Sequence, residues 1–223
     1  MQMLIVPGLG GSGPDHWQSH WERSYPGASR VMQSDWNRPV RALWLERLAA
    51  ALESRPGAIL VGHSLGCALI ADLAMRRPDL RIGGALLVAP ADVDRAHFVS
   101  PQVSEFAPMP GVELPFRAVV VASTNDPYMT IGHARLLAKA WGAGLVNAGP
   151  CGHINVAAGF GPWPAGEKIL GELVAECRMH AGLNPGAGRR AVFGRDIVGS
   201  NSAPESRPAR PSWRFRSPQA DQP

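Results

Sequence analysis

A serine in a glycine-containing motif is the residue of this sequence most suited to act as a nucleophile. Residues 62–66 read Gly-His-Ser-Leu-Gly and directly follow the apolar run 58–61. The Gly-X-Ser-X-Gly pattern is typical of a sharp strand-to-helix turn that holds its serine in a strained conformation with the hydroxyl exposed. Glycine suits both flanking positions because a side chain there would collide with the neighbouring strand or helix. We therefore take Ser64 as the candidate nucleophile; the alternative is a structural glycine-rich turn in a parallel α/β protein.

A carboxylate and an imidazole that follow later strands could activate this serine. Asp126 comes after the apolar run 116–123, and His153 comes after the run 144–148. Parallel strands present their carboxyl ends at one edge of a sheet, so we expect Ser64, Asp126 and His153 to converge there. His153 would remove the Ser64 proton and later protonate the leaving group, while Asp126 would fix the imidazole tautomer and stabilise the imidazolium. Such a mechanism requires no metal ion and no cofactor.

Other side chains compete for the acid and base roles. Asp92 and Asp94 also follow a predicted strand. The Asn-Asp-Pro turn at 125–127 favours Asp126, because it holds that carboxylate at the end of its strand. His97 is the alternative base, since it lies in the loop after the same strand as Asp92. The remaining histidines are interpreted as surface or packing residues: His16, His20, His63, His133 and His180.

The chemistry also needs N–H groups directed at the negative charge that develops on the substrate oxygen. Each such donor typically contributes about 3 kcal/mol to transition-state stabilisation. Leu65 would supply one, because it opens the helix after Ser64. The other is expected in the glycine-rich loop 7–13, where Pro7 has no N–H and Leu9 is our choice. A phosphate-binding loop is disfavoured, because no Gly-Lys-Ser/Thr ends the run.

Two tryptophans are candidates for the walls of a substrate pocket. Trp17 and Trp36 follow strand ends or lie in the loops after them. At those positions they could contact an acyl or leaving group. The other tryptophans are expected mostly in the core, since amphipathic spacing such as that of Trp17 and Trp21 is usually structural.

Alternating strands and helices would position these groups. Strands are expected near 2–7, 29–33, 58–62, 83–89, 116–123 and 143–148, and helices near 14–24, 40–54, 64–76, 130–141 and 165–180. This order predicts an α/β fold with a mostly parallel six-stranded sheet flanked by helices. The connection 91–115 carries prolines and has no room for a lid domain. We therefore expect little or no lid and an open site.

Further short motifs occur in order along the chain. They are Pro-Gly-Leu-Gly at 7–10, Gly-Pro-Asp-His-Trp-Gln at 13–18, Asp-Trp at 35–36 with Pro39 and Trp44, the serine turn, Ser-Thr-Asn-Asp-Pro-Tyr at 123–128, Trp-Gly-Ala at 141–143, Gly-His-Ile-Asn at 152–155 and Gly-Phe-Gly-Pro-Trp-Pro at 159–164. With them the sequence resembles the retinoblastoma-binding-protein-nine/YdeN-like family of small serine hydrolases, within the α/β-hydrolase superfamily. The resemblance covers nearly all of residues 1–180. It implies a compact hydrolase with the triad Ser64, Asp126 and His153, and esterase-like or peptidase-like activity on small substrates.

Composition separates a domain at 1–183 from a tail at 184–223. The tail is rich in Pro, Ser and Arg, and its seven basic and three acidic residues account for the net charge of +4 of the whole 223-residue chain. We expect no stable structure in the tail, because it cannot bury enough apolar surface to offset its ordering entropy. A basic tail could bind nucleic acid, but its scattered arginines favour a passive extension.

Cysteine content and hydropathy indicate the compartment. No apolar run approaches the ~20 residues needed to span a bilayer, and the N-terminus lacks a signal-peptide pattern. Cys67, Cys151 and Cys177 are unpatterned, which is typical of free thiols in a reducing cytoplasm. Cys151 is interpreted as a packing residue. We predict a cytoplasmic serine hydrolase that acts on a small ester, thioester or peptide through an acyl-enzyme; the alternative is a non-catalytic binding protein that uses its surface or basic tail.

Overall fold

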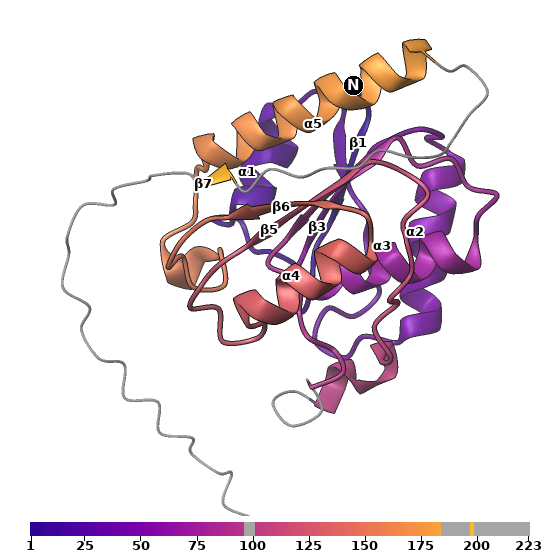
Figure 1. Cartoon of the computed structure of the whole chain (residues 1–223). Helices are drawn as coiled ribbons and strands as arrows, with labels where there is room; N and C mark the ends of the chain where they lie inside the picture. The colour runs from indigo at the N-terminus through magenta and orange to yellow at the C-terminus, as the bar shows by residue number, and fades with distance from the viewer. Residues whose placement is uncertain (96–100, 184–196, 199–223) are drawn as a thin grey trace, which may run out of the picture.

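A parallel sheet runs through the middle of the molecule. The computed structural model describes residues 1–95, 101–183 and 197–198. Its strands follow the order β2-β1-β3-β4-β5-β6-β7, and every neighbouring pair is parallel (Figure 1). The six expected strands are β1 (Met3–Val6), β2 (Ala28–Arg30), β3 (Ile59–His63), β4 (Gly84–Val88), β5 (Ala118–Ala122) and β6 (Gly144–Asn147). The predicted six-stranded parallel arrangement is therefore confirmed.

A seventh strand was not expected. β7 (Ile197–Val198) pairs in parallel with β6 and comes from the part of the chain assigned to the tail. Ile and Val are β-branched residues that suit a strand. By pairing with β6, this strand satisfies backbone groups of β6 that would otherwise be unpaired at the edge of the sheet.

Helices cover both faces of the sheet (Figure 1). One face carries α1 (Trp17–Ser24) and α5 (Pro164–Leu183), and the other carries α2 (Arg41–Glu53), α3 (Leu65–Arg76) and α4 (Ile131–Ala140). Successive side chains of a strand point to opposite faces. Along β1, Leu4 and Val6 pack on the α2–α3–α4 side and Met3 and Ile5 on the α1–α5 side. Burial on both faces explains why the strands are apolar at nearly every position.

The chain order places a crevice between β1 and β3. β1 lies between β2 and β3, and Val6 at the end of β1 is level with Gly62 of β3. From these two strand ends the chain runs to helices on opposite faces, to α1 after β1 and to α3 after β3. Such a switch point is where open parallel sheets bind ligands. The glycine-rich loop and the serine turn therefore meet there.

The connection between β4 and β5 is short of regular structure. Within its described residues, the one helix is the 3-10 helix η2 (Pro101–Phe106). Val103 and Phe106 are buried in the core on the α2–α3 side. The described part of this connection thus contains no lid domain.

No helix among the described residues is both long and apolar enough to cross a bilayer.

A buried ion pair joins α2 to α3. The side chain of Asp72 is 2% exposed, and its two oxygens each accept a hydrogen bond of 2.8 Å from Arg41. Arg76 donates a third hydrogen bond to the same carboxylate at 2.8 Å. Burial raises the pKa of Asp72, but the hydrogen bonds from the two arginines outweigh it and leave the pKa lowered. The carboxylate is therefore charged and fully partnered, as a buried ion must be.

Candidate active site

Ser64 occupies a strained turn between β3 and α3. Its backbone has φ 55° and ψ −121°, a sparsely populated region for a residue with a side chain. A Cβ on Gly66 would lie 2.1 Å from the carbonyl oxygen of Val6, and one on Gly62 would lie 2.8 Å from the Ile70 side chain. Both glycines thus allow the close approach predicted from the motif. Ser64 itself is half-buried and lines a cavity.

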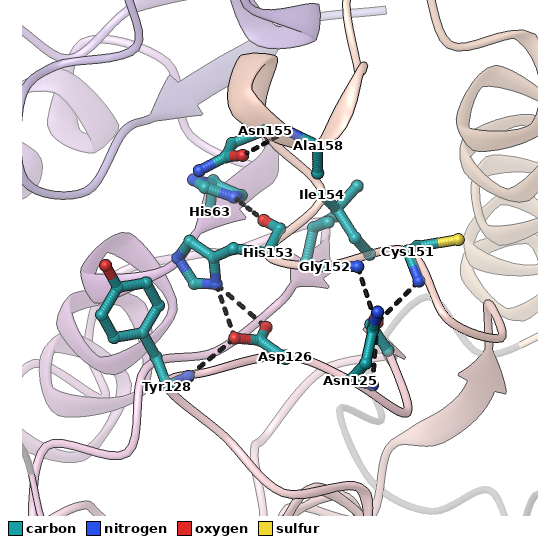
Figure 2. A network of polar contacts seen from close by, with 12 residues as sticks. His63, Asn125, Asp126, Tyr128, Cys151, Gly152, His153, Ile154, Asn155 and Ala158 are labelled. Atoms are coloured by element: carbon teal, nitrogen blue, oxygen red, sulfur yellow. Dashed lines mark hydrogen bonds and ion pairs between the residues drawn. The ribbon is translucent and has the colours of Figure 1, made fainter. Parts of the chain in front are cut away.

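His153 and Asp126 form a buried pair at the same edge of the sheet (Figure 2). His153 Nδ1 lies 3.0 Å and 2.9 Å from the two carboxylate oxygens of Asp126, whose side chain is 2% exposed. The N–H of Tyr128 also donates to Asp126, at 2.9 Å. Because Nδ1 donates to the carboxylate, Nε2 of the neutral ring is left without a proton and can accept one.

Two side chains brace the loop of the acid against the loop of the histidine. Asn125 Oδ1 accepts hydrogen bonds from the N–H of Gly152 at 2.7 Å and from Ser123 Oγ at 2.8 Å. Ser123 Oγ in turn accepts the N–H of Cys151 at 2.9 Å. Figure 2 shows the hydrogen bond between Gly152 and Asn125 beside the His153–Asp126 pair. The two residues that precede His153 are therefore anchored to the strand-end loop that carries Asp126.

A second histidine supports the first. His63 is buried, and its Nε2 donates a hydrogen bond of 2.9 Å to the carbonyl oxygen of His153 (Figure 2). The His63 ring lies 4.9 Å from the His153 ring and 4.8 Å from the His16 ring. Burial lowers the pKa of His63 well below its usual range. Burial and the charge of Arg30 lower the pKa of His16 to about 4. Both supporting rings are therefore neutral near pH 7.

One cavity of about 600 Å³ collects the predicted residues. Ser64, Asp126, His153, Leu9 and Leu65 all line it. Neither the Leu9 nor the Leu65 N–H donates a hydrogen bond to another described residue. The Ser64 hydroxyl makes no hydrogen bond to His153 in this structure, and such contacts are often long before substrate binds. The donors and the proton acceptor thus border a single space.

The glycine-rich loop is held in place by two polar side chains. Arg30 donates hydrogen bonds to the carbonyl oxygens of Gly11 and Ser12, the second at 2.8 Å. Gln18 is fully buried, accepts the Ser12 hydroxyl at 2.7 Å and donates to the carbonyl oxygen of Val61 at 2.9 Å. Gln18 therefore ties the loop after β1 to β3. Sequence reasoning missed both residues, although a polar residue at a buried helical position is a signal that could have found Gln18.

The predicted pocket tryptophans lie elsewhere, which corrects that expectation. Neither Trp17 nor Trp36 lines the cavity. Trp17 is fully buried, and its Nε1 donates to the carbonyl oxygen of Ile154 at 2.9 Å. Trp36 packs so closely on Gly11 that a Cβ there would lie 2.6 Å from the indole. Both rings support the loops around the site. The prediction was wrong because a position near a strand end does not determine which way a side chain points.

The competing acids have other partners. Asp92 Oδ2 accepts a hydrogen bond from His133 Nδ1 at 2.6 Å, and Asp94 accepts the N–H of Met109 at 2.9 Å. His97 lies outside the described residues. The structure thus brings Asp126, and neither competitor, to His153. Over the described parts of the chain, no group of His, Cys, Asp and Glu side chains is arranged to hold a metal ion.

Comparison with known proteins identifies the class of protein. The sequence matches the serine hydrolase family over residues 3–172, so the chain belongs to that family and is an enzyme. A protein from Pectobacterium atrosepticum described as a YdeN-like hydrolase is 36% identical, with a TM-score of 0.70 over 79% of this chain and 91% of that chain. The predicted resemblance to YdeN-like serine hydrolases is therefore confirmed.

More distant structures share the α/β-hydrolase fold. The ydeN gene product from B. subtilis is 21% identical, with a TM-score of 0.66 over 78% of this chain and 98% of that chain. Est1E from Butyrivibrio proteoclasticus is 12% identical, with a TM-score of 0.59 over 78% and 88%. At these identities the likeness shows the fold alone. A comparison with curated protein sequences found no match.

Proposed function

We propose that this serine hydrolase cleaves a small ester, thioester or amide through an acyl-enzyme on Ser64. The observation that carries the proposal is the His153 imidazole, hydrogen-bonded to the buried carboxylate of Asp126 and lining the same cavity as the strained Ser64. A nucleophile, a base and a group that orients the base are the components of a catalytic triad.

The reaction follows from these positions. Ser64 Oγ attacks the substrate carbonyl carbon while His153 Nε2 takes the hydroxyl proton, and the carbonyl electrons move to its oxygen. The N–H groups of Leu9 and Leu65 stabilise that oxyanion. When the tetrahedral intermediate collapses, His153 returns the proton to the leaving alcohol, thiol or amine. Water, deprotonated by His153, then hydrolyses the acyl-enzyme and restores the Ser64 hydroxyl.

Cavity size indicates the kind of substrate. A volume of about 600 Å³ lies within the range of sites that bind small molecules. We accordingly propose a small-molecule or short peptide substrate, with no role for nucleic acid in the domain. All three cysteines are free thiols, which suits the cytoplasm as the proposed compartment.

Covalent labelling tests the nucleophile. A fluorophosphonate probe should add once per chain, and peptide mapping should place it on Ser64. Ser64→Ala should abolish labelling. Ser54 is the control, because it is exposed and does not line the cavity, and Ser54→Ala should still be labelled. Full labelling of Ser64→Ala would contradict the proposal.

A further inference from the structure

Some charged side chains in the cavity wall have hydrogen-bond partners among the described residues, and one does not. The charged residues among those that line it are Asp92, Arg95 and Asp126. Asp126 is paired with His153 and Asp92 with His133. The guanidinium of Arg95, by contrast, makes no hydrogen bond or ion pair with another described residue, and Arg95 is exposed. Arg95 is therefore the one arginine or lysine among the described residues that line the cavity, and no described residue pairs with its guanidinium.

Hydrogen bonds hold the backbone of Arg95 in place. Its backbone N–H donates to Asp92 Oδ1 at 3.2 Å, and the other oxygen of that carboxylate is held by His133 at 2.6 Å. The N–H of Asp92 also donates to the carbonyl oxygen of Tyr128 at 3.1 Å. The turn that carries Arg95 is thus tied both to α4 and to the loop of Asp126.

Part of the wall of the cavity that Ser64 and Arg95 both line is apolar. Ala91, Val103 and Met129 line the cavity and are buried. The N–H of Ala91 donates to the Ser64 carbonyl oxygen at 3.3 Å, which places this wall beside the nucleophile. Aliphatic carbons suit such a surface, because their transfer out of water is favourable. A guanidinium beside it recognises a carboxylate through paired N–H donors.

We propose that Arg95 binds a carboxylate on the acyl part of the substrate, so that the preferred substrates are monoesters of short aliphatic dicarboxylic acids. The proposal rests on the acyl-enzyme function above and adds the substrate class and a specificity-determining residue. The aliphatic chain lies along Ala91, Val103 and Met129, with the ester carbonyl at Ser64 and the free carboxylate at Arg95.

Equilibrium binding separates recognition from catalysis. In the Ser64→Ala background, the affinities for monoethyl glutarate and ethyl pentanoate are measured by calorimetry; the two esters share an acyl chain length and differ in the carboxylate. Arg95→Gln should lower the ratio of these affinities by at least about tenfold, as expected for loss of one charge-assisted hydrogen bond. Arg95→Lys keeps the charge and should retain part of the ratio.

Arg81→Gln is the matched control. Arg81 is exposed and precedes β4, at the opposite end of that strand from Arg95, so the same change in net charge should leave the ratio unaltered. An unchanged ratio in Arg95→Gln, an equal fall in Arg81→Gln, or no measurable binding of monoethyl glutarate would overturn the assignment.

Turnover distinguishes this assignment from the proposed function. The protein with Ser64 intact should hydrolyse monoethyl glutarate with the higher kcat/KM, and Arg95→Gln should remove that preference. If neither ester is hydrolysed while the binding ratio still depends on Arg95, the acyl-enzyme proposal fails and the carboxylate site stands. If both esters are hydrolysed equally well, the acyl-enzyme proposal stands and the carboxylate site fails.

Discussion

Asn125 Oδ1 lies 2.7 Å from the backbone nitrogen of Gly152, and this hydrogen bond joins the loop of the acid to the loop of the histidine. The two loops leave neighbouring strands, β5 and β6, and the bond fixes their spacing at the point where Asp126 meets His153. A shift of about 1 Å in a catalytic group can lower a rate by about 100-fold. The loop of the imidazole is therefore linked to a side chain that is not hydrogen-bonded to the imidazole itself.

Substitution of Asn125 should reveal this positioning role. Asn125→Leu removes the acceptor, and we expect kcat to fall by about 10- to 100-fold with KM little changed. Asn125→Asp keeps an acceptor oxygen for the Gly152 N–H and should recover most of the rate. A similar loss in both variants would mean that Asn125 acts through fold stability alone, which thermal unfolding of each variant would report.

The proposed acid can be tested against its neighbour in the cavity. Asp126→Asn should preserve the fold and lower kcat by up to about 10⁴-fold, because the amide favours the wrong imidazole tautomer. Asp92→Asn changes another buried carboxylate that is hydrogen-bonded to a histidine, and it should cost far less in kcat. The larger loss in Asp92→Asn would show that the acid has been assigned to the wrong residue.

His16 should make the stability of the protein sensitive to acid. Its pKa is about 4 in the folded protein and 6.5 as the ordinary value, so the unfolded chain takes up the proton first as the pH falls. The stability is fully present above about pH 6.5 and is lost towards pH 4; between pH 7 and pH 5 the loss is roughly 2 kcal/mol. His16→Asn keeps an oxygen to cap α1 and should flatten this dependence in urea titrations. Equal pH slopes in the two proteins would contradict the burial argument.

The buried ion pair between α2 and α3 should contribute more to the free energy of unfolding than an exposed ion pair does. Asp72→Ala leaves the Arg41 guanidinium without its carboxylate, and we expect a loss of about 3–5 kcal/mol in the free energy of unfolding. Asp79→Ala breaks an exposed pair with Arg77 and should cost much less. Denaturant titrations of both variants at one pH make the comparison, and equal losses would show that burial is not what matters.

Catalysis should belong to residues 1–183, where we place the domain. All the residues that line the cavity fall within 9–157. β7 lies at the edge of the sheet, and β4, β5 and β6 separate it from β3, which leads to Ser64. Deletion of 184–223 should leave kcat/KM on a neutral ester within about threefold, equivalent to less than ~1 kcal/mol. A large fall at unchanged thermal stability would place part of the tail in the site.

Local pattern accounts for the parts of the site that the sequence could predict. Ser64, Asp126 and His153 each follow an apolar strand, and parallel strands bring their ends to one edge. Gln18 and Arg30 act through partners distant in sequence or on another element, and no local pattern reports such contacts. The orientation of Trp36 depended on packing against Gly11 in the same way.

Braced loops also affect how the rate should vary with temperature. Arg30 and Gln18 hold the loop of Leu9, and Asn125 holds the loops of Asp126 and His153, before any substrate arrives. Few backbone torsions then remain to be frozen on the way to the transition state. For the acylation step we expect an activation entropy close to zero, so that the barrier is almost entirely enthalpic and the intercept of an Eyring plot lies near ln(kB/h).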